Sequence, residues 1–379
     1  MEQFLPNFTW HSPTRVVFGV GRLADLRGLV DEFAGEQARI FLVTGRSSLR
    51  ARGILGRVVE SLGEDRVALF DRVSPYPSPA LVDAAAAECR DAGCGVVVAI
   101  GGGSVMDLAK VVAIMSGLEG NAREFATGEK VISKPGLPFI AVPTTSGSSS
   151  EVTMGAALWD RDEKEQMGLA SPHMFPKAAV VDPEMTMSMS KTLAAVTGMD
   201  AFTSAIESYW STEAEPLTDG INLQVVQMFN ANLDRSSIQG DIESRANCAL
   251  AATMSGIAYS NSRPNACHAV GVPLTLHWEV EHGQAVGVTL TTFLRWAAPG
   301  IPHKLPALWR ALGVHDLDGA CDRITRIMTR CGLETRLSGL GLMEGDLDRL
   351  VESTRWNRTV ALPIPLGPDD LRGMLGKLL

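Results

Sequence analysis

The stretch GGGSVMDLAK, Gly101–Lys110, decides the fold of this chain. It follows the apolar run VVVAI at 96–100, which is typical of a strand buried in a parallel sheet, and apolar residues then recur at helical spacing to Met115. Glycines let the backbone approach an anion closely, and a helix N-terminus offers it free N–H groups. The alternative is a plain strand-to-helix turn. We expect a phosphate cradle formed by four consecutive residues: Gly101, Gly102, Gly103 and Ser104.

Length and composition restrict the class of protein. A chain of 379 residues is long enough for two domains, and a net charge of −9 argues against a general nucleic-acid or anionic-membrane partner. No apolar run is as long as a membrane span, and MEQFLPNFTW lacks the pattern of a signal peptide. The six cysteines form no CxxC pair, so free thiols in a cytoplasmic protein are the simplest account.

The two halves of the chain differ in periodicity. Up to about residue 187, short β-like runs alternate with helical patterns such as 49–62 and 78–92, which predicts a parallel sheet covered by helices. The expected strands are Arg15–Phe18, Ile40–Val43, Val67–Phe70, Val96–Ile100 and Phe139–Val142. From about 188 onward the strand signals almost vanish, and long helical patterns run through 191–212, 216–233, 241–260, 282–297, 303–312, 318–331 and 343–354. The predicted architecture is an α/β dinucleotide-binding domain at 1–187 followed by an all-α domain at 188–379.

The end of the second expected strand bears on the choice of cofactor. Dinucleotide folds that prefer NAD generally place a carboxylate here to hold the adenosine ribose. This chain instead continues with Gly45, Arg46 and Ser47. A guanidinium matches a 2′-phosphate with two parallel hydrogen bonds. The loop therefore favours NADP(H) over NAD(H), although a solvated polar loop would have the same composition.

A second polar loop, TTSGSSSEVT at 144–153, directly follows the expected strand at Phe139–Val142. Its hydroxyl groups and backbone N–H groups suit a nicotinamide ribose or a phosphate. The expected contacts are Thr144, Thr145, Ser148 and Ser149.

The glycine-rich stretch at 101–110 and the polar loop at 144–153 also resemble segments of a known family. GGGSxxDxxK resembles the pattern of the iron-containing (group III) alcohol dehydrogenases, whose superfamily includes glycerol dehydrogenase and dehydroquinate synthase, and 141–153 is similar to the family's PTTxGTGSEVT loop. The resemblance implies the dehydroquinate synthase-like fold, an NAD(P)-dependent oxidoreductase, a homodimer, and a cofactor-binding role for Asp107. One departure is Gln166, where the family commonly has a Lys near the nicotinamide ribose.

Two later segments resemble the family's metal-binding motifs. TGMDAFTSAIESYW at 197–210 is similar to DAxxHAIE, whose Asp and His share a helical face, but Ser204 replaces the His. RPNACHAVGVPLTLHWEVEHG at 263–283 is similar to HxxxxPLxxxxxxxHG. The resemblance therefore implies three metal ligands, Asp200, His268 and His282. Zn²⁺ suits three protein ligands with one open position, whereas Fe(II) prefers more, and a metal-free site of the maleylacetate reductase type is the alternative.

Neighbouring residues suggest the substrate. RPNACH is similar to a segment of phosphonoacetaldehyde reductases, which implies that Arg263 holds an anionic group, with a helix cap as the alternative role. Cys267 adjoins His268 but is not expected to bind the metal. His277 takes an aromatic position of the family, either lining the pocket or relaying a proton.

The expected function is NAD(P)H-dependent reduction of a small, anionic, phosphonoacetaldehyde-like aldehyde, with the metal as Lewis acid. The alternatives are a metal-independent reductase of the maleylacetate reductase type, a dehydroquinate synthase-like cyclase or lyase, and a non-catalytic relative. Residues 255–285 contain one Arg and no Lys, which disfavours the cation-rich site of the cyclase.

Overall fold

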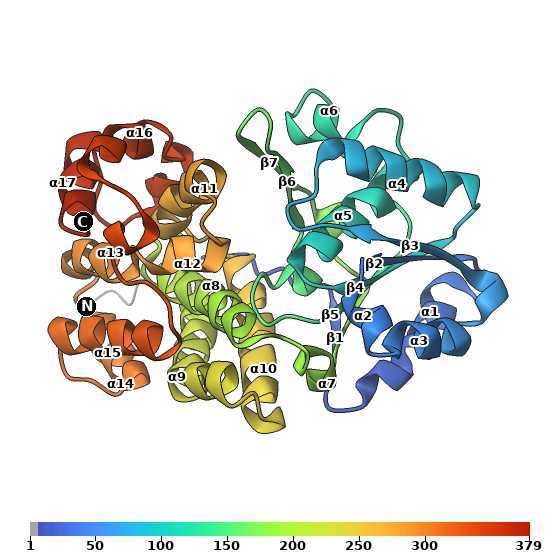
Figure 1. The fold of residues 1–379 in the computed structure, drawn as a ribbon, viewed down its shortest axis with the longest axis horizontal. Coiled ribbons are helices and arrows are strands. Elements are labelled where there is room, and N and C mark those ends of the chain that lie inside the picture. Colours follow the sequence, from blue (N-terminus) through green and yellow to red (C-terminus); the bar gives the residue numbers. More distant parts are fainter. Residues whose placement is uncertain (1–6) are drawn as a thin grey trace. The chain divides into compact units, whose positions relative to one another are not determined.

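The computed structural model describes residues 7–379, which form two compact units (Figure 1). One unit is Pro13–Met189, and the other is Ser190–Leu379 together with residues 7–12. No helix in the described part of the chain is long and apolar enough to cross a membrane.

The first unit contains a six-stranded parallel sheet with the strand order β1-β8-β5-β4-β2-β3. The strands are β1 (Arg15–Phe18), β2 (Ile40–Gly45), β3 (Val67–Val73), β4 (Val96–Gly101), β5 (Phe139–Pro143) and β8 (Ala178–Val181). All five strands expected from the sequence are present, so the predicted α/β fold is confirmed. β4 and β5 are apolar throughout because helices cover both faces of the sheet.

Helices α1 (Leu26–Ala34) and α3 (Ile54–Leu62) cover one face of the sheet, and α4 (Pro79–Asp91) and α5 (Gly103–Met115) cover the other (Figure 1). The single helix expected at 49–62 is interrupted, because Gly53 takes a φ of 65° between α2 (Ser48–Ala51) and α3. Two short helices, α6 (Ala122–Ala126) and α7 (Pro183–Thr186), complete this unit.

An antiparallel hairpin that the sequence did not predict also belongs to this unit. Strands β6 (Gly155–Asp160) and β7 (Glu165–Ala170) pair only with each other. The buried side chains of Ala156 and Leu158 join the core cluster that α5 shares with the sheet. The hairpin therefore packs on the helix that begins at the glycine-rich turn.

The second unit is helical, as the sequence predicts. The helices in chain order are α8 (Lys191–Trp210), α9 (Pro216–Ile238), α10 (Ile242–Tyr259), α11 (Ala266–Trp278), α12 (His282–Gly287), α13 (Leu290–Ala297), α14 (Leu305–Leu312), α15 (Leu317–Arg330), α16 (Leu347–Glu352) and α17 (Pro368–Gly376). α8 is buried along nearly its whole length, because α9, α10, α11 and α12 all pack against it. Its residues therefore lie at the centre of this unit.

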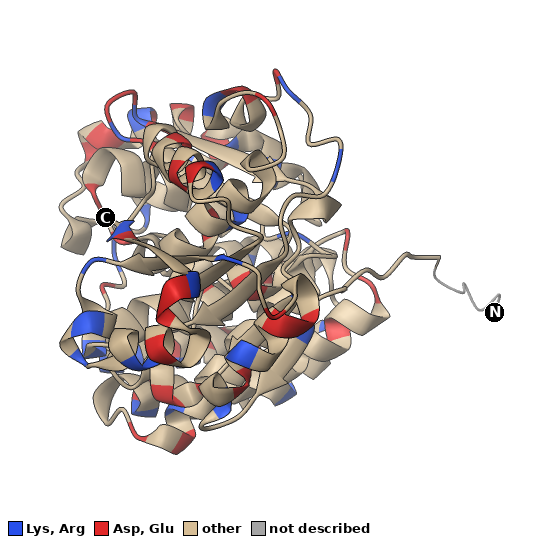
Figure 2. Ribbon diagram, turned by 90° about the vertical axis from the view of Figure 1, so that its right-hand side faces the viewer, with Lys and Arg blue, Asp and Glu red and all other residues tan. Residues whose placement is uncertain are grey.

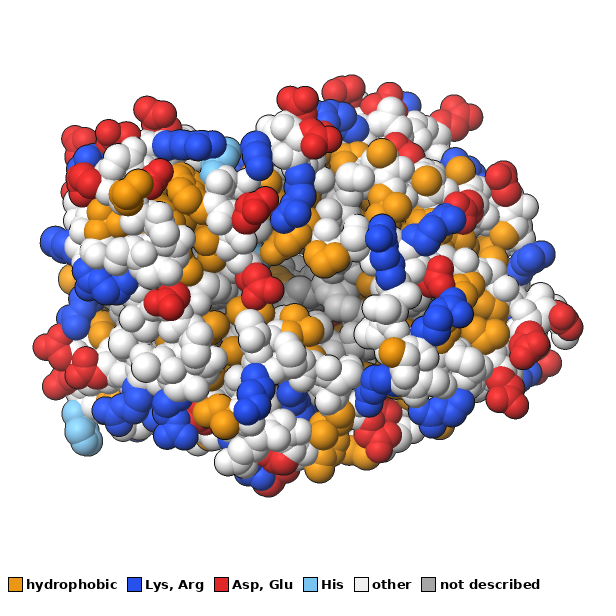
Figure 3. Space-filling model, in the orientation of Figure 1, with side chains coloured by type: hydrophobic (Ala, Val, Ile, Leu, Met, Phe, Trp, Pro, Cys, Tyr) orange, Lys and Arg blue, Asp and Glu red, His pale blue; other side chains and the backbone are white. Residues whose placement is uncertain are grey.

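The charged and apolar side chains at the surface are dispersed. Figure 2 shows acidic and basic residues interspersed along the helices of both units, and Figure 3 shows apolar side chains scattered among charged ones on the face it presents. The face in Figure 3 shows no continuous basic patch of the kind that binds nucleic acid.

Candidate functional site

The glycine-rich turn and the polar loop after β5 lie together at the carboxyl edge of the sheet. β4 and β5 are neighbouring parallel strands, with Gly101 opposite Pro143. The Thr144 N–H donates to the Gly101 carbonyl at 2.9 Å. The structure therefore brings the predicted cradle residues and the residues at 144–149 to one place. This is the edge at which parallel α/β sheets bind their ligands.

Two glycines permit this close approach. A Cβ on Gly103 would lie 2.7 Å from the Ser148 hydroxyl, and one on Gly102 would lie 3.3 Å from the Thr145 side chain. Gly103 is the first residue of α5, so the helix N-terminus faces the loop without an intervening side chain. The Ser104 hydroxyl accepts from the Tyr76 N–H at 3.1 Å. The cradle therefore contacts the polar loop after β5 on one side and Tyr76 on another.

Asp107 and Lys110 are the other polar residues of the glycine-rich motif. Both lie on α5 and form hydrogen bonds to the polar loop after β5 and to the start of β6. The Asp107 carboxylate accepts from the Ser150 hydroxyl at 2.7 Å and from the Ala157 N–H at 3.0 Å. The buried Lys110 ammonium donates to Ser150 and to the Gly155 carbonyl at 2.9 and 2.5 Å. Burial lowers the pKa of Lys110 to about 8, against the opposing effect of Asp107. Both residues therefore support the loop, and the sequence did not indicate this role for Lys110.

The loop after β2 lies at the same edge of the sheet, since β2 is the other neighbour of β4. Arg46 and Ser47 are exposed there, directly after Gly45. Arg50 instead forms an ion pair with Asp71 of β3 at 2.5 Å. The carboxylate on the neighbouring strand thus partly neutralises this loop, which sequence reasoning about β2 alone did not anticipate.

The three predicted metal ligands lie together in the helical unit. Asp200 comes from α8, His268 from α11, and His282 is the first residue of α12. One ligand atom from each lies within 4.8 Å of the others, and Nε2 of His268 lies 3.3 Å from Oδ1 of Asp200. One carboxylate and two imidazoles are a donor set that suits a divalent transition metal. The residues present therefore fit the metal that the family resemblance implies.

A glycine next to His282 lets its helix approach α8. A Cβ on Gly283 would lie only 1.7 Å from the carbonyl oxygen of Val196, which lies one helical turn before Asp200. No other residue type fits this contact without moving the backbone. The close approach of α12 to α8 brings His282 to Asp200.

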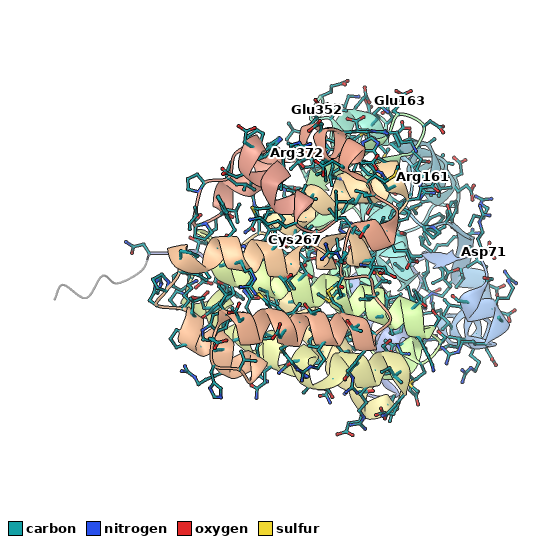
Figure 4. The ribbon with its side chains drawn as sticks, turned by 60° about the vertical axis from the view of Figure 1, so that its left-hand side comes forward. Asp71, Arg161, Glu163, Cys267, Glu352 and Arg372 are labelled. Carbon is teal, nitrogen blue, oxygen red and sulfur yellow. The ribbon has the colours of Figure 1, made fainter. Side chains whose placement is uncertain are left out.

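Glu207 lies behind His268 and was missed by the sequence analysis. Its fully buried carboxylate contacts Nδ1 of His268 and accepts from the N–H groups of Asn265 and Cys267 at 3.2 and 2.6 Å. Cys267 (labelled in Figure 4) therefore serves this site through its backbone. Because Nδ1 donates to Glu207, Nε2 of His268 is the ring nitrogen that would bind a metal. The sequence does contain a signal for Glu207: it follows Asp200 by seven residues, and this spacing places both on one face of a helix.

The surroundings of the cluster shift the pKa values of its two histidines in opposite directions. Burial disfavours a charged His268, but Glu207 and Asp200 outweigh it and raise its pKa to about 9. Burial lowers the pKa of His282 to about 4. Burial also opposes ionisation of Asp200, yet the two histidines hold its pKa below the usual range. A metal ion binding at neutral pH therefore has to displace a proton from His268.

Ser204, at the position of the fourth family ligand, is buried beside the cluster. Its hydroxyl lies 3.4 Å from Nε2 of His268. A Ser side chain is shorter than a His side chain, so a metal bound by the other three residues would keep one position open to water or substrate.

His277 and Arg263, two other residues predicted to act in catalysis, do not belong to the metal-ligand cluster. Nδ1 of His277 accepts from Arg349 at 3.0 Å, and nine residues of helix separate His277 from His268, which places the two on opposite faces of α11. Arg263 is exposed in the connection between α10 and α11. The three-residue cluster within the described residues includes neither. Their proposed roles in catalysis stay predictions.

Two family models match most of the chain. The model of the iron-containing alcohol dehydrogenase family matches residues 13–183, and the model of the C-terminal part of the Fe-containing alcohol dehydrogenase family matches residues 194–370. The chain is 33% identical over 326 residues to 4-hydroxybutyrate dehydrogenase of Cupriavidus necator, which covers 83% of this chain and 85% of that protein. It is 29% identical over 362 residues to 1,3-propanediol dehydrogenase of Klebsiella pneumoniae, covering 93% and 91%.

Among solved structures, a sulfoacetaldehyde reductase from Bifidobacterium kashiwanohense in complex with NAD⁺ superposes with a TM-score of 0.93. The two chains are 29% identical, and the alignment covers 99% of each. The sequence motifs, the fold and these relatives agree: the chain belongs to the iron-containing alcohol dehydrogenase family and is an oxidoreductase of alcohols and aldehydes.

Proposed function

We propose that this protein is an NAD(P)H-dependent reductase of small aldehydes that carry an anionic group, and that it uses a divalent metal. The observation that carries the proposal is the cluster of Asp200, His268 and His282, with Glu207 bound to Nδ1 of His268. A metal bound here supplies Lewis-acid polarisation of the substrate carbonyl. Zinc is the expected metal, because three protein ligands and one open position suit it.

Different residues of the chain are assigned to metal binding and to dinucleotide binding. Asp200, His268 and His282 would hold the metal, and Glu207 fixes the orientation and tautomer of His268. The turn Gly101–Ser104 and the loop after β5 would bind and orient a dinucleotide, whose chemistry is hydride transfer.

The names of two relatives support an anionic substrate. Both 4-hydroxybutyrate and sulfoacetaldehyde are short molecules with an oxygen function at one end and an acid group at the other. Oxidation of NADPH or NADH should be followed with sulfoacetaldehyde, phosphonoacetaldehyde and propanal. We expect the anionic aldehydes to have the higher kcat/KM. Preference for propanal would contradict the substrate class, and substrate turnover without net cofactor consumption would indicate the cyclase or lyase alternative.

We propose further that NADPH is the preferred cofactor. β2 ends in Gly45, and Arg46 is exposed directly after it. A Cβ on Gly45 would meet only the Val73 carbonyl, at 3.9 Å, so an Asp side chain fits there. We expect Gly45→Asp to lower the NADPH-to-NADH ratio of kcat/KM by about tenfold or more, because a carboxylate repels the 2′-phosphate and binds the ribose hydroxyls. A parent enzyme that already prefers NADH, the cofactor that accompanies the sulfoacetaldehyde reductase structure, would contradict this part of the proposal.

The close contact at Gly103 gives a second test of the cofactor site. Gly103→Ala places a methyl group 2.7 Å from the Ser148 hydroxyl, so the polar loop has to move away from the cradle. We expect the KM for the dinucleotide to rise about tenfold or more, because a shift of about 1 Å at a binding site has effects of this size. Gly28→Ala on α1 is the matched control, since its Cβ would meet nothing within 4 Å. An equal rise in both variants would show that the cradle contact does not matter.

A further inference from the structure

A short turn near the C-terminus is fixed against the helix that carries His268. Pro273 lies inside α11 and has no N–H, so the carbonyl of Ala269 lacks its helical donor. The Arg355 N–H supplies that hydrogen bond at 3.1 Å. Ala269 is adjacent to His268, so the turn that follows, η8 (Trp356–Ala361), begins beside the metal cluster.

Both ends of this turn are held. The Arg358 N–H donates to the Arg355 carbonyl at 2.9 Å, and the Ala361 carbonyl accepts from Thr212, just beyond the end of α8, at 2.9 Å. The turn therefore bridges α11 and the end of α8, the two helices that supply His268 and Asp200. Arg358 lies at its centre.

The guanidinium of Arg358 interacts electrostatically with Glu207, the carboxylate that contacts His268. Burial lowers the pKa of Arg358, the charge of Glu207 opposes this effect, and the neighbouring Arg355 adds to it. Within residues 7–379, the Arg358 side chain forms no hydrogen bond or ion pair that would compensate this burial. No hydrogen bond or ion pair joins Arg358 to Glu207 within the described residues, and the oxygens of Glu207 accept from His268 and from two backbone N–H groups.

The positive charge of Arg358 has no matching negative charge among the metal ligands and Glu207 once a divalent metal is bound. A bound divalent metal is balanced by the carboxylates of Asp200 and Glu207, so Arg358 contributes one positive charge in excess. Partly buried guanidinium groups are ordinarily paired, and their planar donors match sulfonate, phosphonate and carboxylate. An anionic group on the substrate would provide the missing partner.

We propose that Arg358 is the residue that binds the anionic group of the substrate and so selects acidic aldehydes over neutral ones. The inference rests on the proposed function, because it names the specificity residue of the same metal site. It gives this role to Arg358, next to the cluster, in place of the exposed Arg263 that the sequence indicated.

The test compares kcat/KM for sulfoacetaldehyde and propanal in four variants: Arg358→Gln, Arg358→Lys, Arg263→Gln and Arg326→Gln. Arg326 is an exposed arginine on α15 and serves as the matched control. We expect Arg358→Gln to lower kcat/KM for sulfoacetaldehyde roughly 30- to 1,000-fold while propanal changes less than about threefold, the effect of losing a buried charge partner. Arg358→Lys should recover part of the loss, because it restores the charge without the planar donors.

Metal content and inhibition complete the experiment. Each variant should keep its metal, and ethanesulfonate should inhibit propanal reduction by the parent enzyme but only weakly by Arg358→Gln. Equal losses for both aldehydes, loss of the metal, or a selective loss in Arg263→Gln instead would overturn the role of Arg358. A parent enzyme that prefers propanal contradicts the proposed function, whereas a preference for sulfoacetaldehyde that survives Arg358→Gln contradicts only this inference.

Discussion

Purified His282→Ala will retain no stoichiometric divalent metal and will reduce aldehydes about a thousandfold more slowly than the parent chain. His282 is one of the three ligands that we propose, and Ser204 is too short to replace it. A metal that polarises the substrate carbonyl lowers the barrier by several kcal/mol, and a thousandfold in rate corresponds to roughly 4 kcal/mol. Metal analysis together with kcat/KM for one aldehyde measures both effects.

His303→Ala is the matched control for this variant, because His303 is an exposed histidine of the same helical unit. It should keep both metal and activity. If His282→Ala loses its metal and remains fully active, the metal has no part in the reaction. The metal-independent reductase of the maleylacetate reductase type would then be the better description.

The parallel sheet could be predicted because its strands are apolar and short and are separated by helical patterns. Buried strands such as β4 differ from their surroundings in both length and composition. The β6–β7 hairpin was not predicted, because strand β7 reads Glu-Gln-Met-Gly-Leu-Ala and contains no β-branched residue. Its formation depends on packing against α5, which is not visible in the local sequence.

The helix that carries His268 was also not predicted. Pro273 removes a backbone donor in the middle of α11 and normally marks the end of a helix. The helix continues because the Arg355 N–H, 86 residues farther along the chain, satisfies the carbonyl that the proline leaves open. A contact between segments so far apart has no signal in the sequence of either one.

The three clustered residues were predicted from motifs, whereas the groups that surround them were not. Asp200, His268 and His282 each occur in a recognisable segment, and the structure places them together. Glu207 and Arg358 lie next to this cluster as a result of tertiary packing. Charged residues at these positions are equally compatible with a solvated surface until the neighbouring helices are known.

Replacing Glu207 should therefore weaken the metal site without removing a ligand. The carboxylate of Glu207 accepts from three donors, Nδ1 of His268 and the N–H groups of Asn265 and Cys267. In Glu207→Gln one acceptor oxygen becomes an NH₂ group, so at least one of these donors faces another donor inside the protein. An unpaired buried polar group costs about 1–3 kcal/mol, and the imidazole of His268 loses the anion that orients it.

We expect the metal affinity of Glu207→Gln to fall roughly 10- to 100-fold, with a lower melting temperature for the metal-free protein. Competition with a chelator measures the first effect, and thermal unfolding after metal removal measures the second. At saturating metal, kcat should recover in large part, because all three ligands remain. Glu352→Gln, which changes an exposed glutamate on α16 (labelled in Figure 4), is the matched control and should leave both quantities unchanged. Unchanged metal affinity in Glu207→Gln would show that His268 keeps its orientation without the buried carboxylate, and that packing alone holds the ring.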